Sequence, residues 1–232
     1  MRTIVSYQNK DELDQGAADI ISQSINRMLE KQKTVVFGIV GGRSVSGIFR
    51  RLRTADISWE KTHIFMLDER IVPLDSPQSN FRLAKENFID ELLMNKRLLP
   101  ENVHPFVMNI CKPDLAISDY EDTLQRYGDI YDIILLSSGE DGHVAGLYPK
   151  HHSVSDESPS YIIFNDSPKP PKDRMSISRR LLVKSKVAIL LFEGKTKRSA
   201  YAKFQDKHCD FNSCPGKLIL LIDDSYVLTN LR

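Results

Sequence analysis

The chain has 232 residues, of which 41% are hydrophobic and 27% charged, and its formal net charge is +1. These values are typical of a globular protein, and the balanced charge gives no electrostatic reason to expect a nucleic-acid or membrane partner. The apolar runs are too short to cross a bilayer, the first residues lack the pattern of a signal peptide, and Cys111, Cys209 and Cys214 are too few for a disulfide framework. We therefore expect a cytoplasmic protein in which any bound anion is met by a local cluster of charge.

Short β-rich runs alternate with amphipathic stretches along the whole chain. This alternation predicts a mainly parallel sheet with helices on both faces. Apolar residues at helical spacing follow the first strand, and Asp11 is placed to cap that helix. No linker or repeat divides the sequence, so we expect a single Rossmann-like α/β domain over residues 1–232. The strands are predicted at 3–7, 35–40, 64–67, 103–108, 131–136, 161–164, 187–192 and 217–222, with later helices at 115–127 and from about 196.

Four polar loops leave the ends of predicted strands, at 41–44, 68–70, 138–143 and 193–197. Open parallel sheets bind their ligands outside the carboxyl ends of the strands, where the loops into the next helices gather. The charged residues of these loops are therefore expected to converge on one edge of the sheet and to form a site there.

The first of these loops contains Gly41 and Gly42 directly before a predicted helix. Glycines at this position allow backbone N–H groups to face an anion, and Arg43 and Ser44 add further donors. The alternative is a tight turn without a ligand. The loop lacks the Gly-Lys-Ser/Thr ending of a P-loop, and the chain has no dinucleotide-binding fingerprint.

The loop after the predicted central strand contains Asp141-Gly142-His143. Gly142 permits a sharp turn, and His143 can accept a proton near neutral pH. Asp141 can hold the imidazole in one orientation, as carboxylates commonly do for catalytic histidines. The alternative is a surface turn with an exposed histidine, but the position at the end of a central strand favours a general base.

Charged residues elsewhere suit the binding of an anion. Asp68-Glu69-Arg70 follows another strand, although it can equally be a solvated loop with a surface ion pair. Arg174 and Lys197 carry the guanidinium and ammonium donors that suit phosphate oxygens, although each alone can be a surface charge.

A metal site is not expected from the spacing of histidines and cysteines. His143, His151 and His152 are close in sequence, and His208-Cys209 lies near Cys214. Neither set has a familiar zinc spacing, and the chain has no Cys-x-x-Cys pair.

Together these loops resemble the 6-phosphogluconolactonase family, relatives of glucosamine-6-phosphate deaminase, over about residues 35–201. Each motif alone is modest, but four in this order and at these separations are specific. They are Asp68-Glu69-Arg70 with Val72-Pro73 and Ser79-Asn80; the run GEDGHVAGLYP at 139–149; Pro170-Pro171-Lys172-Asp173-Arg174 with Ser176-Ile177-Ser178; and Gly194-x-x-Lys197.

The resemblance implies hydrolysis of 6-phosphoglucono-δ-lactone in the oxidative pentose phosphate pathway, without a cofactor. It implies that His143 activates the attacking water, that Asp141 orients the base or a sugar hydroxyl, and that Arg70 lies near the developing oxyanion with Asp68 beside it. We expect a monomer or a small homo-oligomer that binds a phosphorylated sugar lactone. The residues implied to hold the substrate and its phosphate are Gly41, Gly42, Arg43, Ser44, Asn80, Arg174 and Lys197.

Two departures from the family pattern bear on these assignments. The first loop reads Gly41-Gly42-Arg43-Ser44-Val45 where the family usually has GGSTP, so a hydroxyl donor and a proline are replaced and a guanidinium is added. Ser138 stands where a glycine is common, which can alter the turn before His143.

Two alternative functions remain open at this point. One is an amino-sugar-phosphate isomerase or deaminase on the same fold. That pattern has Asn-Glu-Pro shortly after the Asp-Gly-His and an aromatic residue where this chain has Arg70, and neither feature is present. The other is a non-catalytic regulator that binds sugar phosphates, which would keep Arg174 and Lys197 while losing the base.

Overall fold

The structure is a computed structural model of the chain that describes residues 2–108 and 113–231. Its centre is a seven-stranded sheet in the order β1-β10-β9-β6-β2-β3-β5, and every neighbouring pair is parallel. The predicted parallel α/β sheet is therefore confirmed. Its strands are β1 (Arg2–Ser6), β2 (Val35–Ile39), β3 (Thr62–Met66), β5 (Val103–His104), β6 (Ile133–Ser137), β9 (Val187–Phe192) and β10 (Asp224–Thr229).

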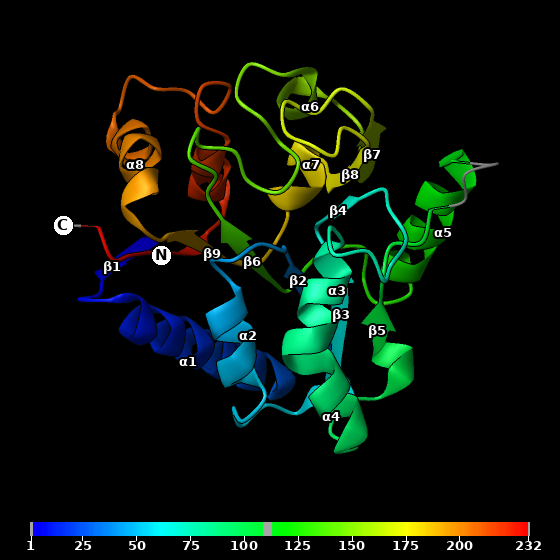
Figure 1. The fold of residues 1–232 in the computed structure, drawn as a ribbon. Helices are drawn as coiled ribbons and strands as arrows, with labels where there is room; N and C mark the ends of the chain where they lie inside the picture. The colour runs from blue at the N-terminus through cyan, green and yellow to red at the C-terminus, as the bar shows by residue number, and fades with distance from the viewer. Residues whose placement is uncertain (1, 109–112, 232) are drawn as a thin grey trace.

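Helices cover the large sheet on both sides (Figure 1). The helices α1 (Lys10–Leu29) and α2 (Ser46–Leu52) lie on one side, and α8 (Arg198–Gln205) lies on the other. The remaining α-helices are α3 (Asn80–Ala84), α4 (Asp90–Met94), α5 (Pro113–Gln125), α6 (His152–Ser155) and α7 (Arg179–Leu182). A short π-helix at Lys85–Ile89 joins α3 to α4. Short 3₁₀ helices lie at Trp59–Lys61, Pro100–Asn102, Lys195–Lys197 and Pro215–Leu221.

The hydrophobic pattern explains the packing of the first helix. Leu13 and Ile21 on its predicted apolar face are fully buried, as expected for side chains that recur at helical spacing. The expected cap at Asp11 is wrong: the helix begins two positions earlier, because the side chain of Asn9 accepts a hydrogen bond from the N–H of Glu12 and forms the cap. A single hydrophobic core extends from this helix to the last strand.

A second, smaller sheet was not predicted. It is antiparallel, in the order β4-β8-β7, and joins β4 (Asp68–Arg70), β8 (Arg174–Ile177) and β7 (Tyr161–Phe164). The residues 68–70 were expected in a loop, because a three-residue strand has too little pattern to be recognised without its distant partner. This sheet places Arg70 directly opposite Arg174.

The strand predicted at 217–222 is wrong. This segment forms the 3₁₀ helix Pro215–Leu221, and the last strand is β10. A short apolar run has the same appearance in a buried strand and in a buried helical turn, so periodicity could not separate the two. Pro215 begins the 3₁₀ helix, and the N–H of Gly216 donates to the carbonyl of Gly142 at 3.1 Å. The misassigned segment thus supports the loop that carries His143.

The strand order places a topological switch point between β2 and β6. From β2 the chain continues outward to β3 and β5, and it then returns to β6 on the other side of β2 before reaching β9 and β10. The loops that follow β2 and β6 therefore diverge and leave a crevice at the carboxyl ends of the strands. No helix of the described residues is long and apolar enough to cross a membrane.

Candidate active site

A cavity of about 520 Å³ opens at this switch point. All four predicted loops contribute to its lining, so the expected convergence is confirmed. Six cationic and three acidic side chains line it, which gives the cavity a local excess of positive charge that the whole chain lacks. Of the predicted site residues, those that line the cavity are Gly41, Gly42, Arg43, Ser44, Asp68, Arg70, Asn80, His143, Arg174 and Lys197.

Asp141 lies behind His143 and contacts its ring. The Oδ1 atom of Asp141 is 2.6 Å from Nδ1 of His143 and also accepts the N–H of His143 at 3.2 Å. Burial acts to raise the pKa of Asp141, but the hydrogen bonds and charge of His143, with the charge of Lys169, outweigh it and hold that pKa well below its usual range. The carboxylate therefore stays ionised and fixes the ring, so that Nε2 of His143 is left for a reactant.

The loop around His143 is a tight turn that depends on two glycines. Gly142 has φ +100°, in the left-handed region that favours glycine. A Cβ atom on Gly139 would lie 2.0 Å from the His143 ring, so only glycine leaves room for the imidazole. The N–H of Gly139 donates to the carbonyl of His143 at 2.8 Å and closes the turn. Ser138, the departure noted before this turn, is buried and its hydroxyl donates to the carbonyl of Gly139.

Glu69 organises the other side of the cavity. Its carboxylate is 2% exposed and accepts hydrogen bonds from the N–H groups of Arg70, Asn80 and Phe81 and from the hydroxyl of Ser79. Burial raises the pKa of Glu69, and the backbone donors oppose that shift. Glu69 thus ties β4 to the start of α3 and sets the positions of Arg70 and Asn80, both of which line the cavity.

The loop after β2 combines a close contact with an exposed cation. Gly41 lies against the Asn80 side chain, and Gly42 has φ +104°. Within the described residues, no hydrogen bond is found for the N–H groups of Arg43 and Ser44. The Arg43 residue is exposed and lines the cavity. The loop therefore offers backbone donors and an exposed guanidinium group to an anion.

Arg70 and Arg174 face each other across β4 and β8, an arrangement that costs stability unless an anion lies nearby. Arg174 is 3% exposed, and its Nε and Nη2 atoms donate to the carbonyls of Pro171 and Pro170. Arg70 is held by a hydrogen bond from Nη1 to the carbonyl of Gln78 at 2.6 Å. Both guanidinium groups therefore have fixed positions at the cavity.

Lys197 is placed in the cavity by the turn that follows β9. Its N–H donates to the carbonyl of Gly194, which has φ +86°. Burial lowers the pKa of the Lys197 ammonium, and the charge of Lys169 acts in the same direction, while Glu140 and Asp141 oppose the shift. A bound anion would relieve the cost of this partly desolvated cation.

Sequence reasoning missed several residues that line the cavity. Lys169 lies 3.6 Å from Oδ2 of Asp141, and the Tyr148 ring centroid lies 4.8 Å from that of His143. Lys169 directly precedes the motif that begins at Pro170, and Tyr148 lies within the run 139–149. Their places in these motifs could have identified them as site residues. Glu140, Glu193, Lys195 and Thr196 also line the cavity; they lie in the loops 138–143 and 193–197 that were expected to converge, but no motif singled them out.

Free thiols and a possible metal cluster lie outside this cavity. Cys209 and Cys214 are not joined by a disulfide, and Cys111 lies outside the described residues. In the part of the chain that the structure describes, one group of three side chains has the arrangement of metal ligands: His151, His152 and Asp166. None of the three lines the cavity.

Comparison with known proteins gives consistent matches along the chain. The family described as glucosamine-6-phosphate isomerases/6-phosphogluconolactonase matches residues 8–227. The chain is 32% identical over 207 residues to a 6-phosphogluconolactonase of Borreliella burgdorferi, which covers 89% of this chain and 88% of the relative. It is 32% identical over 190 residues to a 6-phosphogluconolactonase of Thermotoga maritima, with 80% and 83% covered.

Solved structures show the same fold. The crystal structure of the Thermotoga maritima 6-phosphogluconolactonase superposes with a TM-score of 0.84 at 23% identity and covers 99% of both chains. A monomeric glucosamine-6-phosphate deaminase superposes with a TM-score of 0.81, also at 23% identity, and covers 98% of this chain and 96% of its own. Since both kinds of enzyme share this architecture, the fold alone does not choose between their reactions.

Proposed function

The chain belongs to the family of glucosamine-6-phosphate isomerases and 6-phosphogluconolactonases, and we propose that it is a 6-phosphogluconolactonase with His143 as its general base. The reaction hydrolyses 6-phospho-D-glucono-1,5-lactone to 6-phospho-D-gluconate in the oxidative pentose phosphate pathway. The observation that carries the assignment of the base is the His143–Asp141 pair, with 2.6 Å between Nδ1 and Oδ1, at a cavity lined by an excess of cations.

The first step is the attack of water on the ring ester. With its Nδ1–H donated to Asp141, the neutral His143 ring presents a lone pair at Nε2. Nε2 removes a proton from water as the water oxygen adds to the lactone carbonyl, whose electron pair moves onto the carbonyl oxygen. The Asp141 carboxylate stabilises the imidazolium that forms, and a positioned base of this kind contributes about 10²- to 10⁴-fold to the rate.

The second step opens the ring. The tetrahedral intermediate reforms its carbonyl and expels the ring oxygen, which takes the proton back from His143 and becomes a hydroxyl group. We assign the negative charge of the intermediate to Arg70, whose guanidinium group is anchored at the cavity by Gln78, with Asp68 beside it. His143 is regenerated, and no group outside the protein and the two reactants is required.

The phosphate is assigned to donors from three segments that line the cavity. The loop 41–44 supplies backbone donors, and Arg174 and Lys197 supply charge. We assign Asn80, which lines the cavity, to the binding of a sugar hydroxyl. Binding of the phosphate at a distance from the lactone carbonyl holds the substrate in one orientation for attack.

The proposal extends to the domain organisation, the compartment and the kind of partner. We propose that residues 1–232 act as one domain in the cytoplasm, supported by the single core and the unpaired Cys209 and Cys214. The net charge of +1 supports a small-molecule partner rather than a nucleic acid.

The test compares the two reactions of the family on the purified chain. We expect rapid hydrolysis of freshly generated 6-phosphogluconolactone, above the spontaneous rate in buffer, and no release of ammonia from glucosamine 6-phosphate. Ammonia release without lactone hydrolysis would assign the chain to the deaminases. Binding of 6-phosphogluconate without turnover of either substrate would make it a non-catalytic binding protein.

A further inference from the structure

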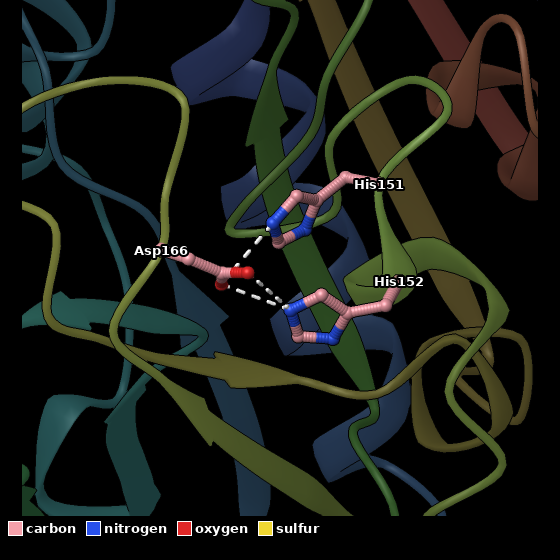
Figure 2. Close-up of side chains that lie close together, drawn as sticks. All are labelled: His151, His152 and Asp166. Atoms are coloured by element: carbon pink, nitrogen blue, oxygen red, sulfur yellow. Dashed lines mark hydrogen bonds and ion pairs between the residues drawn. The ribbon is translucent and has the colours of Figure 1, made fainter.

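His151, His152 and Asp166 converge beside the catalytic cavity, with their ring nitrogens and carboxylate turned toward one another (Figure 2). His151 and His152 lie at the start of α6, and Asp166 follows β7. The Nε2 atom of His151 is 3.2 Å from Oδ1 of Asp166, and Nε2 of His152 is 2.9 Å from Oδ1 and 3.1 Å from Oδ2. All three ligand atoms lie within 4.8 Å of one another.

We propose that this cluster binds one divalent transition-metal ion, best matched by Zn²⁺, through Nε2 of His151, Nε2 of His152 and a carboxylate oxygen of Asp166. Imidazole nitrogen and carboxylate oxygen are common zinc ligands, at about 2.0–2.2 Å from the ion. Two ligands at that distance in a tetrahedral site are about 3.3 Å apart. The two nitrogen–oxygen distances are close to this value, so small side-chain movements admit the ion, and water completes its coordination.

The surroundings of His151 support a ligand at its Nε2 atom. This atom is buried and makes no hydrogen bond to the described residues, although a carboxylate is nearby. The Nδ1 atom of the same ring is 3.0 Å from the hydroxyl oxygen of Ser153. That Nδ1 atom also accepts the backbone N–H of Ser153 at 3.2 Å, so binding of the ion through Nε2 requires the ring proton to move to Nδ1, where the Ser153 hydroxyl oxygen can accept it.

Hydrogen bonds alone do not account for all three ligand atoms of the cluster. His152 can donate to Asp166, since its Nε2 atom is 2.9 Å from Oδ1. The buried Nε2 atom of His151 remains without a hydrogen bond in that arrangement. One ion accounts for both rings and for the carboxylate between them.

The position of the cluster assigns the ion a structural role. The Tyr148 ring separates it from the base, with centroids 4.8 Å from His143 and 5.9 Å from His151. Asp166 lies three residues before Lys169, which lines the cavity and approaches Asp141. The ion would therefore join the segment after the catalytic loop to the loop that carries Lys169, without contacting the substrate.

The experiment is a calorimetric titration of the full-length chain with ZnCl₂ after dialysis against a chelator and then into phosphate-free buffer. We expect one ion per chain, and we expect His152→Ala and Asp166→Asn each to weaken binding by about tenfold or more. The side chains of His152 and Asp166 are 54% and 56% exposed, so their replacement leaves the core intact. Circular dichroism verifies the fold of each variant, and Zn²⁺ should raise the melting temperature of the wild type more than that of either variant.

Two control variants separate this site from other zinc ligands on the chain. Cys209→Ser removes a thiol next to His208, and His143→Ala removes the ring in the cavity; both should keep the high-affinity ion. Loss of binding in either control, with binding retained in His152→Ala, would place the ion elsewhere and overturn the proposal. Absence of binding at micromolar Zn²⁺ to the folded wild type would also overturn it.

Discussion

The side chain of Asn80 fills the space that a Cβ atom on Gly41 would need, since such an atom would lie 2.1 Å from Oδ1 of Asn80. Asn80 is held there by Nδ2, which donates to the carbonyl of Asp68 at 3.0 Å. Its Oδ1 atom is buried and makes no hydrogen bond to the described residues. The glycine at position 41 is therefore required by this close approach.

Gly41→Ala should raise the KM for 6-phosphogluconolactone by about tenfold, because the Asn80 amide must move, at a cost on the order of 1–3 kcal/mol. Steady-state kinetics and denaturant unfolding measure the two effects. In an Asn80→Ala background the same substitution should cost less than half as much in both measurements. Equal costs in the two backgrounds would show that the contact with Asn80 is not the reason for the glycine.

Lys197→Ala should raise the KM for the phosphorylated lactone by about 10- to 100-fold with little change in kcat, as expected when a charge-assisted hydrogen bond to phosphate is lost. The matched substrate is D-glucono-1,5-lactone, which has no phosphate, and its kinetics should not change. Lys172→Ala, which alters an exposed lysine that does not line the cavity, serves as the control. Equal losses on both lactones would contradict a phosphate contact.

Gly142→Ala should lose activity, whereas Gly128→Ala should not. Both glycines have positive φ, +100° and +113°, so each substitution strains the backbone by about 1–2 kcal/mol. Only Gly142 directly precedes His143 in the chain. A Cβ atom added to Gly142 would lie 3.2 Å from Sγ of Cys214. We expect both variants to lose stability in chemical denaturation, Gly142→Ala the more because of its contact with Cys214, and a fall in kcat confined to Gly142→Ala. Retained activity in that variant would show that the turn does not position the base.

Stability should fall in acid because the partly buried His104 lies against the buried His63. Burial lowers the pKa of His104 to about 4, helped by the charge of His63, and Nε2 of His104 is 3.1 Å from Nδ1 of His63. The unfolded chain binds the proton more tightly, so the stabilisation is complete above about pH 6.5 and is lost as the pH falls toward 4.

The free energy of unfolding should decrease by about 1–3 kcal/mol over this interval, after allowance for the partial exposure of His104. The measurement is urea unfolding at several pH values. His104→Phe should flatten the dependence on pH, and His208→Ala, which alters an exposed histidine, should retain it. An unchanged slope in His104→Phe would assign the effect to other groups.

The parallel sheet and the convergence of its loops could be predicted, because both depend on local pattern and on a general rule for the carboxyl ends of strands. Arg70 facing Arg174 could not be predicted, since their pairing depends on the register of two short antiparallel strands far apart in the sequence. The role of Glu69 was also hidden, because its hydrogen bonds to the start of α3 exist only after β4 has formed.

The segment 217–222, predicted as a strand, shows a similar limit in the prediction of local structure. The apolar run at 217–222 has no distinctive period, and the tertiary contact between Gly216 and Gly142 accompanies its 3₁₀ conformation. The cluster of His151, His152 and Asp166 was missed for a similar reason, since the carboxylate comes from a different loop and the spacing fits no familiar zinc motif.

The most direct test of the central claim is the hydrolysis of freshly generated 6-phosphogluconolactone by the wild type and by His143→Ala, corrected for spontaneous opening of the ring. His143→Ala should keep its fold and its affinity for 6-phosphogluconate while kcat falls by about 10²- to 10⁴-fold. Asp141→Asn should show a loss of similar size, because the asparagine amide can donate to Nδ1 and so leave the ring proton on Nε2, where the base needs its lone pair. A His143→Ala variant with nearly the wild-type rate would contradict the assignment of His143 as the general base.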